Sequence, residues 1–128
     1  MLSGGLGTTT AMWDAQLASF AARCRVVRVD HPGHGRSPVP TSRIAVDDVG
    51  RALLALLDEL GIGRASFCGL SLGGMVGQWL GANTPERIER LVIACTGASL
   101  GTRELYDERA ALVRREGVEV VVEGARER

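Results

Sequence analysis

Apolar residues recur along the chain at the spacing that places them on one face of a helix. Between residues 46 and 60, six of them repeat every three or four positions, and a glycine then ends the pattern. These six are Val46, Val49, Leu53, Leu56, Leu57 and Leu60. Residues 11–22 show a shorter version of the pattern, with Trp13 expected in the core, and residues 72–82 and 103–115 also suit helices.

Short apolar runs separate these segments and have the length and residue types of strands. Residues 25–30 are rich in valine, residues 64–68 follow the longest predicted helix, and residues 88–95 form the run IERLVIAC. Helices and strands therefore alternate along the chain with short connections. This order predicts an α/β fold in which helices flank a parallel sheet.

Composition places the chain among ordinary globular proteins. Of its 128 residues, 45% are hydrophobic and 23% are charged, which excludes wholesale disorder. Fifteen basic residues balance fifteen acidic ones, so no net positive field is available to attract nucleic acid or an anionic membrane surface. The chain contains no apolar run near the ~18 residues of a membrane span, and its first ten residues lack the basic and apolar regions typical of a signal sequence. We expect a cytoplasmic protein that binds neither nucleic acid nor membranes.

The three cysteines are too widely spaced to indicate a disulfide framework or a zinc site. Cys24, Cys68 and Cys95 form no C-x-x-C pair, and their number is odd. Each is therefore expected to be a buried free thiol, and no metal site is expected.

The segment most informative about chemistry is Gly69-Leu70-Ser71-Leu72-Gly73, a G-x-S-x-G pattern between a predicted strand and a predicted helix. A serine on a sharp strand-to-helix turn leaves no space for side chains two positions before and after it, which explains Gly69 and Gly73. The turn exposes the Ser71 hydroxyl, and the N–H of Leu72 points into the same space from a helix N-terminus. Ser71 is therefore the candidate nucleophile and Leu72 a candidate oxyanion donor. An ordinary turn serine is the structural alternative.

An upstream motif adds to this pattern, because residues 30–37 read DHPGHGRS. Together the two motifs resemble the α/β-hydrolase superfamily, whose members carry D-x-x-G-H-G-x-S before G-x-S-x-G. More narrowly, residues 6–16 and 69–92 resemble the 3-oxoadipate enol-lactonases. The resemblance covers essentially the whole chain. It implies hydrolysis of a small carboxylated enol-lactone to 3-oxoadipate in aromatic catabolism, the β-ketoadipate pathway, by a Ser, Asp and His triad and without a metal or organic cofactor.

The same resemblance implies a second oxyanion donor near the start of the chain. Residues 2–7 take the place of the superfamily's H-G-x-G loop, with Gly4 and Gly5 where the usual His and Gly stand. The second donor is then the backbone N–H of Leu6, and because only a main-chain group is needed, the change at Gly4 does not exclude this role.

A substrate carboxylate would suit an arginine, since the guanidinium group binds carboxylates through two parallel hydrogen bonds. The sequence offers several candidates near its end and does not choose among them. They are Arg103, Arg109, Arg114, Arg115, Arg126 and Arg128.

The triad implied by the resemblance is incomplete in these residues. In this fold the acid and the His follow the nucleophile, but both histidines, His31 and His34, precede Ser71. The resemblance assigns His34 to a structural loop, and His31 is expected at the surface. We therefore expect residues 1–128 to be an incomplete α/β-hydrolase domain, with its core over about 1–97 and the start of a helical cap over about 98–128. The acid and base would lie outside this sequence, and the chain alone would be inactive.

Two alternatives remain open. The first is another α/β-hydrolase, such as a carboxylesterase that acts on simple esters. The second is a non-catalytic truncated remnant that binds a small acid or a partner. The missing His favours the remnant, whereas the intact glycines of a strained elbow oppose it.

Overall fold

One sheet of four parallel strands lies at the centre of the fold, within the residues that the computed structural model describes, namely 1–99, 101–117, 119 and 120. The strands are β1 (Leu2–Ser3), β2 (Arg28–Val29), β3 (Ala65–Leu70) and β4 (Ile88–Ala94). Their order across the sheet is β2-β1-β3-β4, and every neighbouring pair is parallel. The predicted parallel α/β sheet is confirmed.

Strand β2 is shorter than the predicted strand over 25–30. In the ladder with β1, Leu2 is paired with Arg28 and Ser3 with Val29. The Leu2 N–H also donates to the carbonyl of Val27 at 2.8 Å, but the regular ladder is two residues long. Residues 25–30 therefore have strand propensity throughout, but β1 offers ladder partners to two of them only.

The helices begin and end close to the predicted residues. They are α1 (Asp14–Ala21), α2 (Val46–Glu59), α3 (Leu72–Asn83) and α4 (Arg103–Glu116). The segment before α1 forms a 3₁₀ turn, Thr10–Trp13. Thr9 caps this turn, because its hydroxyl accepts the Ala11 N–H at 3.4 Å. The helix predicted over 11–22 is therefore an α-helix preceded by a tighter turn.

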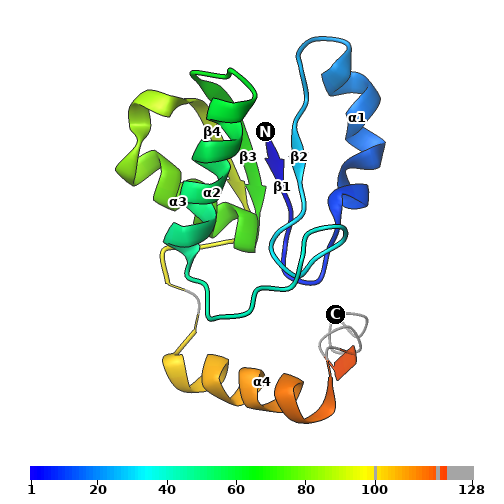
Figure 1. Cartoon of the computed structure of the whole chain (residues 1–128), viewed down its shortest axis with the longest axis vertical. Helices are drawn as coiled ribbons and strands as arrows, with labels where there is room; N and C mark the ends of the chain where they lie inside the picture. Colours follow the sequence, from blue (N-terminus) through cyan, green and yellow to red (C-terminus); the bar gives the residue numbers. More distant parts are fainter. Residues whose placement is uncertain (100, 118, 121–128) are drawn as a thin grey trace. The chain divides into compact units, whose positions relative to one another are not determined.

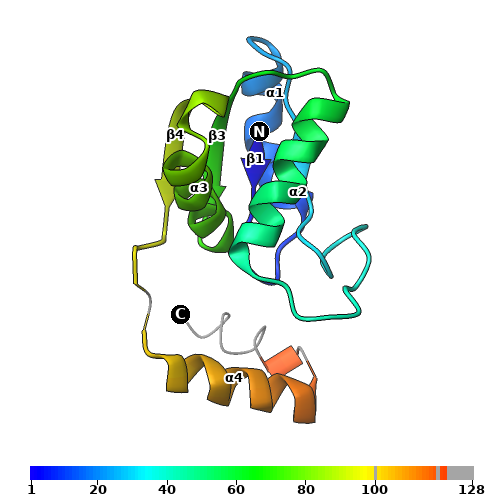
Figure 2. The same cartoon turned by 60° about the vertical axis from the view of Figure 1, so that its left-hand side comes forward.

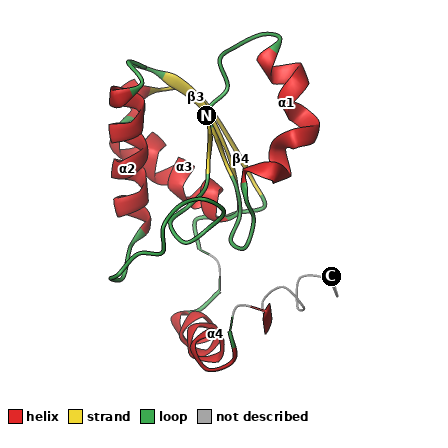
Figure 3. Cartoon of the chain, turned by 45° about the vertical axis from the view of Figure 1, so that its right-hand side comes forward, coloured by secondary structure: helices red, strands yellow, loops and turns green. Residues whose placement is uncertain are grey.

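Helices cover the two faces of the sheet unequally. Helices α2 and α3 lie together on one face, and α1 lies on the other (Figures 1 and 2). The same division is visible in Figure 3, where the strands separate α1 from α2 and α3. The core lies under α2 and α3. It consists of Val49, Leu53, Phe67, Val76, Leu80 and Ile88.

The exposure of Trp13, Phe20 and Trp79 shows where this core ends. Trp13 is 9% exposed, as predicted for a core residue, but Phe20 on the same predicted face is 39% exposed. Trp79 packs against the core from its margin. A Cβ at Gly50 would lie 2.2 Å from the Trp79 ring, so this glycine allows α2 and α3 to approach each other. The core is therefore built mainly on one face of the sheet.

The chain divides into two compact units, Met1–Ala98 and Ser99–Arg128. The second unit contains α4, whose N-cap Thr102 accepts the Leu105 N–H at 3.4 Å and whose described side chains are all at least partly exposed. No helix within the described ranges combines the length and the apolar composition needed to cross a membrane.

Candidate active site

Ser71 occupies the sharp turn between β3 and α3. Its backbone has φ 54° and ψ −110°, a region that non-glycine residues rarely adopt, and its N–H donates to the Ala94 carbonyl of β4 at 2.9 Å. A Cβ at Gly69 would lie 2.2 Å from the Gly73 carbonyl oxygen, and a Cβ at Gly73 would lie 2.3 Å from that of Ser3. Backbone atoms thus occupy the space on both sides of Ser71, and only glycine fits at either position.

The segment that follows β1 lies against this turn. A Cβ at Gly5 would lie 3.4 Å from the Cβ of Ser71, and the Gly73 N–H donates to the Gly4 carbonyl at 2.9 Å. The segment itself turns back at Leu6, because the Thr8 N–H donates to the Gly5 carbonyl at 3.2 Å. Glycine is required at position 7, where φ is +78°. The turn after β1 is thereby placed next to the candidate nucleophile.

Two backbone N–H groups near Ser71 are available for an oxyanion. Among the described residues, neither the N–H of Leu72, at the start of α3, nor that of Leu6 donates to another group. The start of a helix favours negative charge through its dipole and its unbonded N–H groups. The structure thus brings the three residues with predicted chemistry, Ser71, Leu72 and Leu6, into one region.

His34 is held by hydrogen bonds at both ring nitrogens. Its Nε2 accepts the Gly7 N–H at 2.9 Å, so this nitrogen carries no proton. Its Nδ1 lies 3.0 Å from the Pro32 carbonyl and must be the nitrogen that donates. In this neutral tautomer, both ring nitrogens of His34 are engaged by the backbone.

His31 is buried, and the expectation that it lies at the surface is wrong. The residue is 4% exposed, and its Nε2 lies 3.0 Å from both the Gly4 carbonyl and the Ser3 hydroxyl. A carbonyl accepts, so Nε2 carries the proton and Nδ1 does not; Nδ1 has no partner among the described residues. Burial lowers the pKa of His31, and so does His34, against the opposing effects of the Gly4 carbonyl and Asp30.

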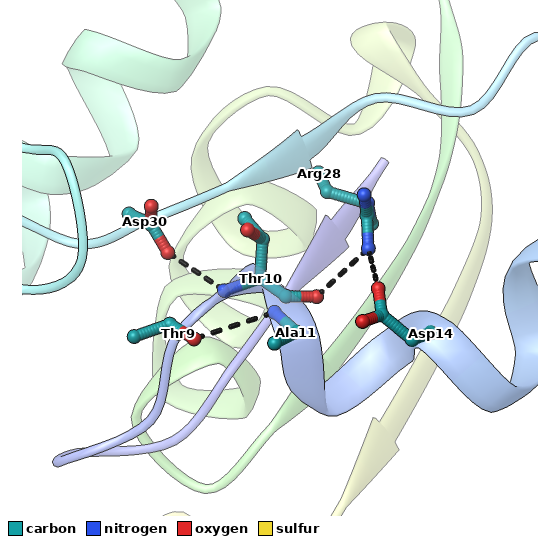
Figure 4. Close-up of polar contacts among 6 residues, drawn as sticks. All are labelled: Thr9, Thr10, Ala11, Asp14, Arg28 and Asp30. Carbon is teal, nitrogen blue, oxygen red and sulfur yellow. Dashed lines mark hydrogen bonds and ion pairs between the residues drawn. The ribbon is translucent and has the colours of Figure 1, made fainter.

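Asp30, the first residue of the DHPGHGRS motif, connects this loop to the start of the 3₁₀ turn (Figure 4). Its carboxylate accepts the Thr10 N–H at 2.7 Å and the Arg36 N–H at 3.2 Å. Desolvation raises its pKa, but the donors from Arg36 and Thr10 and the nearby charges outweigh this effect and lower it. Arg28 donates to the Thr10 carbonyl at 3.1 Å and pairs with Asp14. The motif is visible in the sequence, whereas these contacts are formed only in the fold.

The expectation of buried thiols is wrong for two of the three cysteines. Cys24 and Cys95 are exposed, and Cys68 is half-buried. Cys95 follows β4, which lies at the edge of the described sheet and exposes most of its residues. Burial raises the pKa of the Cys68 thiol, although the N-terminal ammonium opposes this, so Cys68 is a poor nucleophile. Within the described residues, His, Cys, Asp and Glu side chains form no group of three that could hold a metal ion.

The arginines expected to bind a substrate carboxylate belong to the second unit. Arg103 pairs with Asp107 at 3.5 Å and Arg115 with Glu116 at 2.8 Å, and all four side chains are well exposed. Arg126 and Arg128 lie outside the described residues. That one of these arginines binds a substrate carboxylate therefore stays a prediction.

A hollow of about 430 Å³ lies between β2, the loop after it and α2. Its lining includes Arg28, Asp30, His31, Arg36, Val49 and Leu53. Ser71 is not part of this lining, so the hollow and the strained serine are separate features of the first unit. The candidate active site is at the serine, because there the strained backbone and two available N–H groups coincide.

Comparison with known proteins adds a family context to this geometry. Residues 1–116 match the sequence model of the family described as alpha/beta hydrolase fold. The 3-oxoadipate enol-lactonase 2 of Acinetobacter baylyi is 39% identical over 125 residues, which make up 98% of this chain and 47% of that protein.

Two solved structures are similar over nearly the whole chain. A hydrolase from Pseudomonas aeruginosa PA01 has 48% sequence identity and a TM-score of 0.90, covering 96% of this chain and 47% of that one. The enol-lactonase from Burkholderia xenovorans LB400 has 39% identity and a TM-score of 0.92, covering 97% and 48%. The chain thus spans about half the length of these relatives.

Proposed function

This chain belongs to the α/β-hydrolase family, and on that premise we propose that the protein is a serine hydrolase that opens 3-oxoadipate enol-lactone to 3-oxoadipate, in aromatic catabolism. The observation that carries the proposal is the strained backbone of Ser71, with the N–H groups of Leu72 and Leu6 nearby and without acceptors among the described residues. The similarity to enol-lactonases supports the choice of substrate. The substrate is then a small carboxylated lactone.

The proposed reaction has two steps. The Ser71 oxygen attacks the lactone carbonyl and gives its proton to a His base, while the Leu72 and Leu6 N–H groups hold the negative oxygen of the tetrahedral intermediate. The ring C–O bond then breaks, the enol oxygen takes the proton back from the His, and the enol becomes the ketone. Water, activated by the same His, hydrolyses the acyl-enzyme and releases the second carboxylate.

The base in this reaction is neither His31 nor His34. Both ring nitrogens of His34 contact the backbone, and His31 uses Nε2 in the same way and has a buried Nδ1. The proposal therefore assigns the base, and the acid that orients it, to residues outside this sequence.

Covalent labelling tests the nucleophile. The whole protein that carries this sequence is treated with a fluorophosphonate, and the modified peptide is identified by mass spectrometry. We expect the label on Ser71, and we expect Ser71→Ala to abolish it and to lower turnover about 10⁶-fold. Ser66→Ala, at an exposed position of β3, is the matched control and keeps wild-type labelling. A wild-type protein without label on Ser71 contradicts the proposal and favours the non-catalytic remnant.

A comparison of substrates tests the specificity. We expect kcat/KM for the enol-lactone to exceed that for an aryl ester such as 4-nitrophenyl acetate. The reverse ranking would favour the alternative that the protein is a carboxylesterase of the same family.

A further inference from the structure

The segment that carries Leu6 is held in place by side chains of the loop that follows β2. His31 donates to the Gly4 carbonyl, two residues before Leu6, at 3.0 Å. His34 accepts from the Gly7 N–H, one residue after Leu6, at 2.9 Å. Leu6 therefore lies between two backbone groups that are each bonded to a histidine.

A third side chain of the same loop also binds the segment that carries Leu6. Asp30, which directly precedes His31, accepts the Thr10 N–H at 2.7 Å (Figure 4). The Gly4 carbonyl also accepts the N–H of Gly73 in α3 at 2.9 Å. The carbonyl that His31 binds is thus the one that joins this segment to the helix following Ser71.

The two histidines have opposite roles in these bonds. His31 must donate through Nε2, because the Gly4 carbonyl can only accept and the Ser3 hydroxyl beside it can accept as well. His34 must accept through Nε2, because its partner is an N–H group. The donor role of His31 leaves its Nδ1 buried without a partner. A buried polar atom without a partner is unfavourable, so it is the Gly4 carbonyl, which needs a donor, that fixes the proton on Nε2.

The segment needs such support because three of its residues, Gly4, Gly5 and Gly7, are glycines. Glycine has the largest conformational freedom to lose, and an oxyanion donor is effective only when its N–H is already aimed at the reacting carbonyl. We propose that His31 and His34 are positioning residues. By binding the backbone before and after Leu6, they keep the Leu6 N–H directed toward Ser71. This inference rests on the proposed function of Leu6 and Ser71.

Paired amide substitutions separate hydrogen bonding from packing. The amide of Gln reaches the position of the ring Nε2, and the shorter amide of Asn reaches that of Nδ1. His34→Asn therefore keeps a donor for the Pro32 carbonyl and loses the acceptor for Gly7, whereas His34→Gln keeps the acceptor. In the same way His31→Gln retains a donor for Gly4, and His31→Asn does not.

The readouts are the rate constant for fluorophosphonate labelling of Ser71, measured in the whole protein, and kcat and KM for the proposed lactone. We expect each Asn variant to label about 10- to 100-fold more slowly, which is less than the full ~10²–10³-fold effect of deleting an oxyanion donor. The decrease should appear in kcat, with KM changed by less than about threefold, because the donor acts in the transition state. Each Gln variant should stay within about threefold of wild type.

Ser37→Ala is the matched control within the same loop, because the Ser37 hydroxyl donates to the Asp30 carbonyl and not to the Leu6 segment. It should label at the wild-type rate. Thermal unfolding of every variant verifies that it is folded. Each histidine has its own pair of Asn and Gln variants, so if one variant does not fold, the pair at the other histidine still tests the proposal.

The outcomes distinguish the two proposals. Folded Asn variants with wild-type labelling would overturn this inference alone, and so would Gln variants as slow as their Asn counterparts. An unlabelled Ser71 in the wild-type protein would overturn the proposed function and this inference with it.

Discussion

The elbow around Ser71 and the segment Gly4–Thr10 meet at the candidate nucleophile, but they are held in place by different means. In the elbow, backbone packs against backbone, and Gly69 and Gly73 leave no space for a Cβ. In the segment Gly4–Thr10, carbonyl and N–H groups are bonded to side chains from the loop after β2. Steric exclusion requires glycine at fixed positions, whereas a side-chain bond can be made by any residue that reaches its partner.

The difference also appears in the energetics. A non-glycine residue at positive φ costs about 1–3 kcal/mol, and Ser71 is kept there by its N–H bond to β4 and by the helix that begins after it. Each hydrogen bond to the segment contributes about 1 kcal/mol. The elbow should therefore respond steeply to one added methyl group, and the segment gradually to the loss of single bonds.

The largest effect is expected from a methyl group in the elbow. Gly69→Ala or Gly73→Ala would bring a Cβ to within 2.2 or 2.3 Å of a carbonyl oxygen, and backbone cannot rotate away as a side chain does. We expect each to lower the free energy of unfolding by about 3 kcal/mol or more, measured by urea denaturation. Gly63→Ala is the control, since nothing lies within 4 Å of its Cβ position, and it should change stability by less than about 1 kcal/mol. Equal effects at all three positions would contradict the steric account.

Loss of one bond to the segment should have an intermediate effect. The two carboxylate oxygens of Asp30 accept the Thr10 and Arg36 N–H groups, and Asp30→Asn replaces one of these oxygens by an amide nitrogen, which cannot accept. We expect a loss of about 1–2 kcal/mol in the free energy of unfolding. Asp47→Asn, which removes an exposed pair with Arg51 on α2, should lose about 0.5 kcal/mol or less. A smaller loss at Asp30 than at Asp47 would mean that this bond does not hold the segment.

Acid should weaken the same contacts through His31. Its pKa in the folded protein is lowered from the ordinary 6.5, mainly by burial, so the unfolded chain binds the proton more readily. The stability that neutral His31 contributes is fully present above pH 6.5 and is lost as the pH falls through 6.5 toward the lowered value. The loss is at most about 1.4 kcal/mol per pH unit for one proton.

Urea unfolding measured from pH 7.5 to 5 tests this, with His31→Gln as the comparison, because Gln does not titrate. Asp30 and His34, which also act on the charge of His31, are unchanged in the variant. The variant should show a shallower decrease than wild type, and an identical decrease would exclude His31 as its source.

The smallest effect is expected from a methyl group in the segment. The Cβ of Gly5→Ala would lie 3.3 Å from Leu70 Cδ2 and 3.4 Å from Ser71 Cβ, and the Leu70 side chain can move by a few tenths of an ångström. The same substitution that disrupts the elbow should here change stability by less than about 1 kcal/mol, as measured by urea denaturation. A loss as large as that at Gly73 would remove the contrast between the two regions.

Much of the fold could be predicted from the sequence, because α2 has a clear apolar face and α3 is apolar along most of its length. The predicted limits of α2 and of β4 agree with the structure to within one residue. The limits of β2 could not be predicted, since its length depends on the residues that β1 offers for pairing. Phe20 and Cys95 belong to residue types that are usually buried, yet both are exposed, because exposure depends on which elements cover a residue.

The candidate site shows the same division. Gly69 and Gly73 mark the elbow in the sequence, because backbone atoms, of Gly73 beside Gly69 and of Ser3 in β1 beside Gly73, leave space for glycine alone. The burial of His31 and the opposite bonding of His31 and His34 had no such local signal. Each depends on a segment about 27 residues away in the chain, Gly4 for His31 and Gly7 for His34.

The sequence by itself therefore determined the alternation of helices and strands, the parallel sheet and the position of the strained serine, since periodicity is local and a glycine on each side of Ser71 marks the sharp turn. The tertiary structure decided which strand residues pair, which thiols are exposed and how the loop after β2 holds the segment that carries Leu6. These features depend on the distance between groups remote in sequence, and hydrogen bonds form only when folding brings donor and acceptor to about 3 Å.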